Sequence, residues 1–120
     1  NSAQIDGGGI FALLSSVRVD DSDFTTNTAV RGGGIASILS TITASRANFS
    51  GNAASSDGGA LDLRTGDSVV LQNCTAEDNV AAGNGGAMAI NAPHLLHTLS
   101  TSFSRNSASS GRGGAVALRQ

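Results

Sequence analysis

The chain has 120 residues, of which 39% are hydrophobic but only 3% aromatic, and its net charge is −2. This length allows one ordinary domain with an aliphatic core, and the weak charge is not the basic surface that nucleic-acid binding requires. No apolar run approaches the roughly 18 residues of a membrane span. The chain begins without Met and ends within a repeated pattern, so we expect it to be an excerpt of a longer protein.

Pairs of glycine recur along the whole chain and divide it into repeats. In chain order the pairs are Gly7 and Gly8, Gly32 and Gly33, Gly58 and Gly59, Gly85 and Gly86, and Gly113 and Gly114. Successive pairs are 25, 26, 27 and 28 residues apart. A period of this length is typical of solenoids. It predicts a single unit, residues 1–120, with about four full coils and a partial coil at each end.

Within each repeat, apolar residues stand at alternate positions, which is the period of a β-strand. In the first full repeat the stretches are residues 10–12, residues 17–19 and residues 28–30, and they recur in the later repeats. Gly, Ser, Thr and Asn are abundant throughout, which disfavours helix. The sequence therefore predicts an all-β fold, a single-stranded right-handed parallel β-helix with three short strands per 25–28-residue coil.

A second signature, Phe-x-x-Asn, runs in phase with the glycine pairs. Its members are Phe24 and Asn27, Phe49 and Asn52, and Phe103 and Asn106, while the remaining repeat has Asn79 in register but Ala76 in place of Phe. Stacked coils would place the aromatic rings in an inward column and the asparagines in an amide ladder at a turn. Cys74, the only cysteine, precedes Ala76 by two residues. We expect it to be buried there and to fill part of the volume that the missing ring leaves.

Two further columns face outward. The residues before the glycine pairs are Asp6, Arg31, Asp57, Asn84 and Arg112, so we expect opposite charges to pair between coils. The outward positions of the first strand are small in most coils, with Phe11 and Asp62 as exceptions. We interpret this flat strip as a feature that lets coils stack and turn tightly. The alternative is a docking surface where another chain or element approaches closely.

Glycine pairs followed by Ala and then Ile, Leu or Val, combined with Phe-x-x-Asn, resemble the repeats of the chlamydial polymorphic outer membrane proteins. They are also similar to the Pmp-like β-helix repeats of other bacteria and of eukaryotic algae. The resemblance covers the whole chain. It implies an extracellular β-helix stalk or passenger used in adhesion or surface structure, in which the repeated Gly, Phe and Asn residues are structural.

Many right-handed β-helices are polysaccharide lyases or hydrolases, so an enzymatic function is an alternative. Such sites need carboxylates clustered on adjacent coils, but the acidic stretch at residues 20–23 aligns with residues 45–48, which contain none. His94 and His97 follow Pro93, and residues three apart in a strand point to opposite faces. We expect them to be exposed loop residues. The glycine pairs are followed by neither the helix nor the Lys that a phosphate-binding loop requires. From these observations together we predict no catalytic residue, cofactor or metal.

Two sequons, at Asn48 and Asn73, are candidate N-glycosylation sites if the protein is secreted by a eukaryote. We expect a non-enzymatic extracellular structural or adhesive β-helix repeat, part of a cell-surface protein, appendage or filament. Its partners would be neighbouring coils or other chains of a surface assembly, with neither nucleic acid nor a membrane span. The alternatives are the passenger of an autotransporter-type adhesin and a carbohydrate-active β-helix enzyme whose site lies outside this segment.

Overall fold

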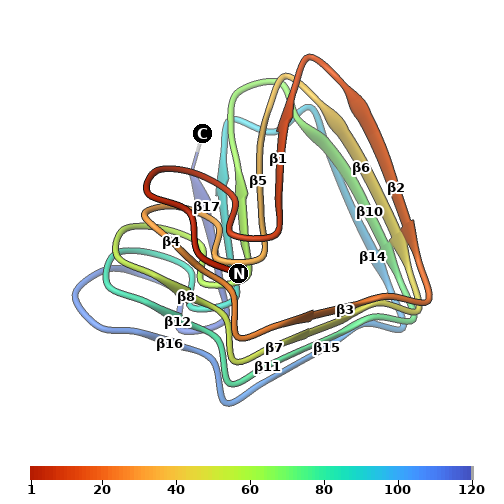
Figure 1. Ribbon diagram of the computed structural model, residues 1–120. Helices are drawn as coiled ribbons and strands as arrows, with labels where there is room; N and C mark the ends of the chain where they lie inside the picture. The colour runs from red at the N-terminus through yellow and green to blue at the C-terminus, as the bar shows by residue number, and fades with distance from the viewer. Residues whose placement is uncertain (120) are drawn as a thin grey trace.

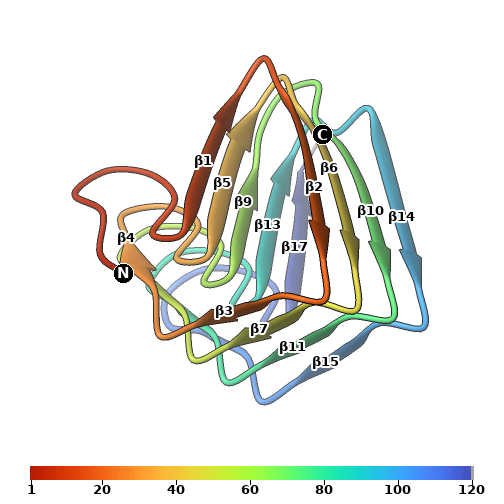
Figure 2. The ribbon, with the colours of Figure 1, turned by 45° about the vertical axis from the view of Figure 1, so that its right-hand side comes forward.

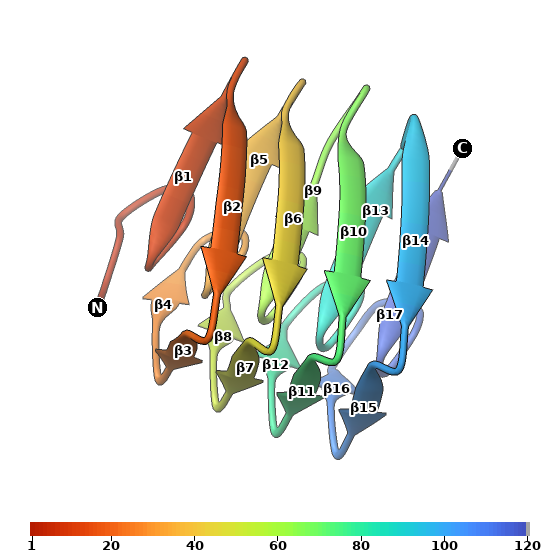
Figure 3. The same cartoon turned by 90° about the vertical axis from the view of Figure 1, so that its right-hand side faces the viewer.

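The computed structural model describes residues 1–119, which form a single-stranded parallel β-helix of about four turns. Seen from the N-terminal end, the chain runs clockwise as it recedes, so the β-helix is right-handed (Figures 1 and 3). Strands of successive turns lie side by side in register, and the described residues contain no helix. The predicted fold class is confirmed.

Two sheets, whose strands mostly have four or five residues, form two walls of the β-helix (Figure 2). The first sheet contains, in spatial order, β1 (Ile10–Leu13), β5 (Ile35–Ile38), β9 (Leu61–Leu63), β13 (Met88–Asn91) and β17 (Val116–Arg119). The second sheet contains β2 (Ser16–Asp20), β6 (Thr41–Ser45), β10 (Ser68–Gln72) and β14 (Leu95–Leu99).

Each turn has four strands, one more than the sequence predicts, because the Phe-x-x-Asn motif carries a short strand of its own. This third sheet contains β3 (Asp23–Thr25), β7 (Asn48–Ser50), β11 (Thr75–Glu77) and β15 (Ser102–Ser104). The fourth sheet, which follows the Asn column, contains β4 (Thr28–Ala29), β8 (Ala53–Ala54), β12 (Val80–Ala81) and β16 (Ser107–Ala108).

Sharp corners separate the strands, and backbone conformation defines them. Residues with positive φ recur at four corners of the turn, for example at Gly58 (φ 66°), Gly66 (φ 79°), Asn73 (φ 52°) and Asp78 (φ 55°). The corner before the first sheet always has glycine, whereas the other three mostly have residues with side chains. The left-handed conformation costs about 1–2 kcal/mol for such residues, so stacking against the neighbouring turns must stabilise these corners.

The glycine pair has an architectural role, and Gly58 and Gly59 illustrate it. Gly58 has φ 66°, a conformation that glycine adopts without steric cost. At Gly59 a Cβ would lie 2.0 Å from the carbonyl oxygen of Gly86 in the next turn and 2.7 Å from that of Val80. The first glycine therefore turns the chain, and the second lets the next turn approach.

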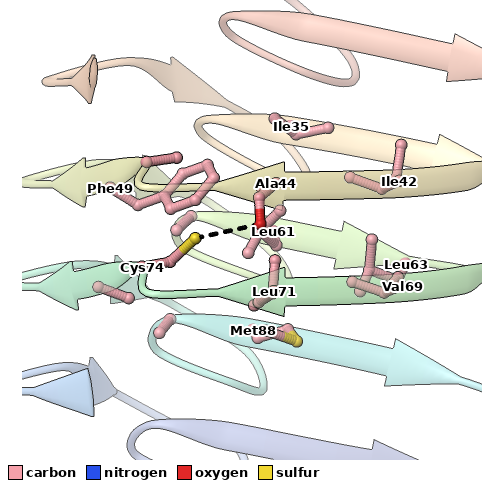
Figure 4. Close-up of a cluster of buried hydrophobic side chains, with 14 of the residues drawn as sticks. Ile35, Ile42, Ala44, Phe49, Leu61, Leu63, Val69, Leu71, Cys74 and Met88 are labelled. Carbon is pink, nitrogen blue, oxygen red and sulfur yellow. Dashed lines mark hydrogen bonds between the residues drawn. The ribbon is translucent and has the colours of Figure 1, made fainter. Parts of the chain in front are cut away.

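The observed register matches the predicted columns. Ala76 pairs with Phe49 on one side and with Phe103 on the other. The rings of Phe24 and Phe49 stack with centroids 5.0 Å apart and planes inclined by 15°. Cys74 is buried in the core beside Ala76, and its thiol donates to the carbonyl oxygens of nearby strands (Figure 4). The predicted burial of Cys74 is confirmed.

The chain between the fourth and the first sheets forms connecting loops that lie outside the first sheet (Figures 1 and 2). We define the connecting loops as residues 3–6, 30–31, 55–57, 82–84 and 109–112. Beneath them, the outward side chains of the first sheet are buried, with exposures of 2% for Ala36, 1% for Asp62 and 3% for Ala89. The small residues of the strip thus accommodate the protein's own chain, and in the middle turns the strip is not a free surface.

Candidate functional site

Two aspartates and two arginines gather around Asp62 on the outer side of the first sheet. Asp62 is the middle residue of β9, so its side chain points away from the core, and Arg64 follows the end of that strand. Asp6, Arg31 and Asp57 are supplied by three successive connecting loops, at the position before the glycine pair. The β-helix therefore brings together side chains from three turns.

Ion pairs connect most of this cluster. Arg64 Nε lies 2.9 Å from Asp62 Oδ2, and Arg64 Nη2 lies 3.5 Å from Asp6 Oδ1. Arg31 donates to both oxygens of Asp6, at 2.7 and 3.3 Å. The pair of Arg31 with Asp6 thus has the bidentate geometry that strengthens such contacts, and Asp6 also has a longer contact with Arg64.

The predicted alternation of charge before the glycine pairs is present only in part. Arg31 pairs with Asp6, as expected, but the structure records no ion pair between Arg31 and Asp57. Asp57 instead accepts two hydrogen bonds from Asn84, one from the backbone N–H at 2.7 Å and one from the side chain at 2.8 Å. The amide of Asn84 takes the place that a cation would have filled.

Asp62 is the most unusual group of the cluster. Its side chain is 1% exposed, and its Oδ1 has no hydrogen-bond partner. Burial raises the pKa of Asp62 from 3.8 to about 7, and the neighbouring carboxylates of Asp57, Asp6 and Asp67 add to the effect, while Arg31 opposes it. Asp62 therefore keeps its proton to a higher pH than an ordinary aspartate does.

A second buried carboxylate, Asp67, lies in the turn between β9 and β10 and has a structural role. Its oxygens accept hydrogen bonds from the hydroxyl of Ser37 at 2.7 Å and from the backbone N–H groups of Ser40 and Arg64 at 2.6 and 2.7 Å. Desolvation raises the pKa of Asp67, and the hydrogen bonds from Ser37 and Ser40 partly offset that rise. Unlike Asp62, Asp67 is fully partnered.

The Asn column forms the predicted amide ladder. Donor nitrogens of Asn27, Asn52 and Asn79 each lie 3.0 Å from the Oδ1 of the asparagine one turn further along. The backbone N–H of each residue donates to the same oxygen at 2.9–3.0 Å. These asparagines are 0–4% exposed, so the ladder joins the turns from within.

Acidic residues at two exposed corners pair with arginines of the next turn. Arg46 donates to both oxygens of Asp21 at 2.5 and 2.7 Å, and these hydrogen bonds lower the pKa of Asp21. Arg105 contacts Asp78 and Glu77 in the same way. Because these pairs are exposed, each contributes little to stability.

The two histidines do not form a joint site. His94 lies in the bend before β14 and His97 within that strand, and both are exposed. The expectation that both are loop residues is therefore wrong for His97, because β14 pairs along its full length with β10. Within residues 1–119 no group of three potential ligands could hold a metal ion, and no helix is long and apolar enough to cross a membrane.

The sequons lie in different surroundings. Asn73 is exposed at the corner between the second and third sheets. Asn48 is half-buried on β7, where its Oδ1 accepts a hydrogen bond of 2.8 Å from the hydroxyl of Thr75. A glycan on Asn73 would project into solvent, whereas one on Asn48 would extend from a half-buried amide whose oxygen is held by Thr75.

The sequence reasoning missed the cluster around Asp62. One feature of the sequence could have indicated it. Asp62 occupies a position at which the neighbouring turns have alanine, because it pairs in register with Ala36 and Ala89. That signal says little unless it is known that the connecting loops cover the outer face of the sheet.

No protein-family model, curated protein or solved structure matches this chain.

Proposed function

We propose that this β-helix is a non-enzymatic structural or adhesive repeat of an extracellular protein, serving as a rigid rod in a cell-surface layer, appendage or filament. The proposal rests on the observation that the buried polar residues hydrogen-bond to other parts of the β-helix. The Asn column joins each turn to the next through amides that are nearly or fully buried, and Asp67 fixes a turn between strands. Contacts of this kind hold the coils of a stack together.

Neighbouring coils or other chains of a surface assembly are the partners that we propose. Equivalent strands of successive turns pair in parallel and in register, as β6 and β10 do, and pairing of this kind can continue into further coils.

The resemblance to Pmp-like repeats supports the extracellular location, since those proteins use the same Gly-Gly-Ala and Phe-x-x-Asn residues. A glycan on exposed Asn73 would agree with it. The cluster around Asp62 does not favour a hydrolase or lyase active site, because a carboxyl that is 1% exposed has no access to a polysaccharide.

Labelling of intact cells tests the proposal. An antibody raised against the folded chain should bind non-permeabilised cells of the source organism, and brief protease treatment of intact cells should abolish the signal. An antibody against an abundant cytoplasmic protein is the matched control and should bind only after permeabilisation. A signal that requires permeabilisation would overturn the proposal. The purified chain should also leave polygalacturonate and alginate uncleaved, and cleavage by this chain would contradict the non-enzymatic proposal.

A further inference from the structure

The middle turn of the β-helix buries an acid where the turns on either side bury alanine. Asp62 is flanked in register by Ala36 in β5 and Ala89 in β13, and all three side chains lie under the connecting loops. Stacking does not require a carboxyl here, since alanine serves in both neighbouring turns. One oxygen of Asp62 also has no partner, a condition that costs free energy in a buried site.

The segments over Asp62 are joined mainly to one another. Backbone hydrogen bonds run from Arg31 to Ile5 at 3.1 Å, from Ser56 to Val30 at 2.8 Å and from Gly83 to Ser56 at 2.7 Å. The ion pair of Asp6 with Arg31 joins the first two of these loops, and the contact of Asp6 with Arg64 ties the first loop to the end of β9. A change of charge beneath the loops would therefore act on several of them at once.

The charge around Asp62 depends on its proton. Asp6 and Asp57 in the loops oppose Arg31 in a loop and Arg64 at the end of β9, so these four groups sum to zero. Asp67, in the turn after β9, is the remaining carboxylate acting on Asp62, while the neighbouring strands present only alanine at this position. Loss of the Asp62 proton to solvent adds a negative charge that has one ion-pair partner, Arg64, and one bare oxygen.

We propose that the connecting loops bearing Asp6, Arg31 and Asp57 form an acid-closed cover over the outer face of the first sheet. The cover lies against the sheet while the Asp62 carboxyl is protonated. When the carboxyl ionises, the loops open often enough for water to solvate it, and the alanine strip beneath them becomes transiently accessible. The opening is local, because the core on the other side of the sheet contains no group of this cluster.

Amide hydrogen exchange on the folded chain, followed by NMR between pH 4 and pH 8.5 and corrected for intrinsic exchange rates, tests this cover. Protection of the Arg31, Ser56 and Gly83 amides should fall by about tenfold per pH unit from roughly pH 4 to pH 7 and level off above, because the open form releases the proton. Amides of Val69 to Leu71 in β10 should not follow this profile. The Asp62 carboxyl carbon should titrate near neutrality.

Two variants separate the cover from general effects of pH. Asp62→Asn keeps the shape of the side chain but carries no titrating proton, and Asp62→Ala reproduces the residue of the neighbouring turns. Both should show loop protection that is independent of pH, whereas Asp23→Asn, which alters an exposed carboxyl on β3, should behave as the unaltered chain does. Flat loop protection in the unaltered chain, or a pH dependence that persists in Asp62→Asn, would overturn the proposal.

Discussion

The side-chain amide of Asn52 donates to the Oδ1 of Asn79 at 3.0 Å, and both residues are 0% exposed. The same Nδ2 also donates to the carbonyl oxygen of Phe24 at 2.8 Å, in the turn before. One side chain thus satisfies backbone and amide groups of three successive turns. In a buried site such polar groups have no water to replace a lost partner, so the ladder should be a main determinant of stability.

Replacing Asn79 by Ala tests how much this ladder contributes to the free energy of unfolding. The change removes the acceptor of two donors of Asn52, at 2.9 and 3.0 Å, and the donor to the Phe49 carbonyl oxygen at 2.9 Å. We expect a loss of at least about 3 kcal/mol in the free energy of unfolding, since each unpaired buried group costs about 1–3 kcal/mol. Urea denaturation followed by circular dichroism measures it. Asn106→Ala, at the half-buried end of the ladder, should cost clearly less; equal losses would argue against cooperation within the ladder.

A pair of glycine substitutions separates backbone conformation from close approach. In Gly59→Ala the new Cβ would lie 2.0 Å from a carbonyl oxygen of the next turn, so the turns must separate and we expect little folded protein. In Gly51→Ala the nearest atom is 3.6 Å away and only the φ of 63° opposes the change, which should cost about 1 kcal/mol. Soluble yield and melting temperature compare the two. Similar behaviour of both variants would contradict the steric explanation.

The repeat and its columns were predictable because equivalent residues of stacked turns meet identical surroundings. The register of Phe24 with Phe49 and the ladder through Asn52 follow from spacing alone. The extra strand was not predictable in the same way. It is set apart by corners at Asp21, Arg46 and equivalent residues, which have no residue type in common.

The cluster around Asp62 escaped prediction for a different reason. Period-two alternation correctly assigns Asp62 to the outer side of its strand, but it does not reveal that connecting loops from other turns cover that side. Burial of Asp62 depends on loops that contain Asp6 and Arg31, distant by 56 and 31 residues in the sequence. Such long-range packing is absent from the local pattern that identifies strands.

A double-mutant cycle tests whether Cys74 fills the space beside Ala76. Ala76→Phe alone would insert a ring between Phe49 and Phe103, where the core already holds the Cys74 side chain, and should destabilise the fold by about 1–3 kcal/mol. Adding Cys74→Ala reproduces the Ala47 and Phe49 arrangement of the previous turn. The double variant should therefore recover at least about 1 kcal/mol relative to the sum of the single changes. Strictly additive effects, measured by urea denaturation, would show that the two sites do not share volume.

The pH dependence of stability should be governed by Asp62, and its sign follows from the pKa. The folded chain binds the Asp62 proton up to a pKa of about 7, above the ordinary value of 3.8. Stability from this group is therefore fully present below about pH 4 and is lost as the pH rises through 7, by at most about 4 kcal/mol. Asp67 acts in the same direction and the exposed Asp21 in the opposite one, and both groups are still present when Asp62 is replaced.

Asp62→Ala isolates this contribution. The variant removes a buried charge and leaves Arg64 its contact with Asp6, so we expect it to exceed the unaltered chain in stability at pH 8 by about 1–4 kcal/mol. At pH 4.5, where the carboxyl is neutral in the folded state, the advantage should shrink. Denaturation curves at both pH values measure the difference. Parallel pH profiles for the two proteins would mean that Asp62 is ionised in the folded state throughout this range, with Arg64 and water compensating for its burial.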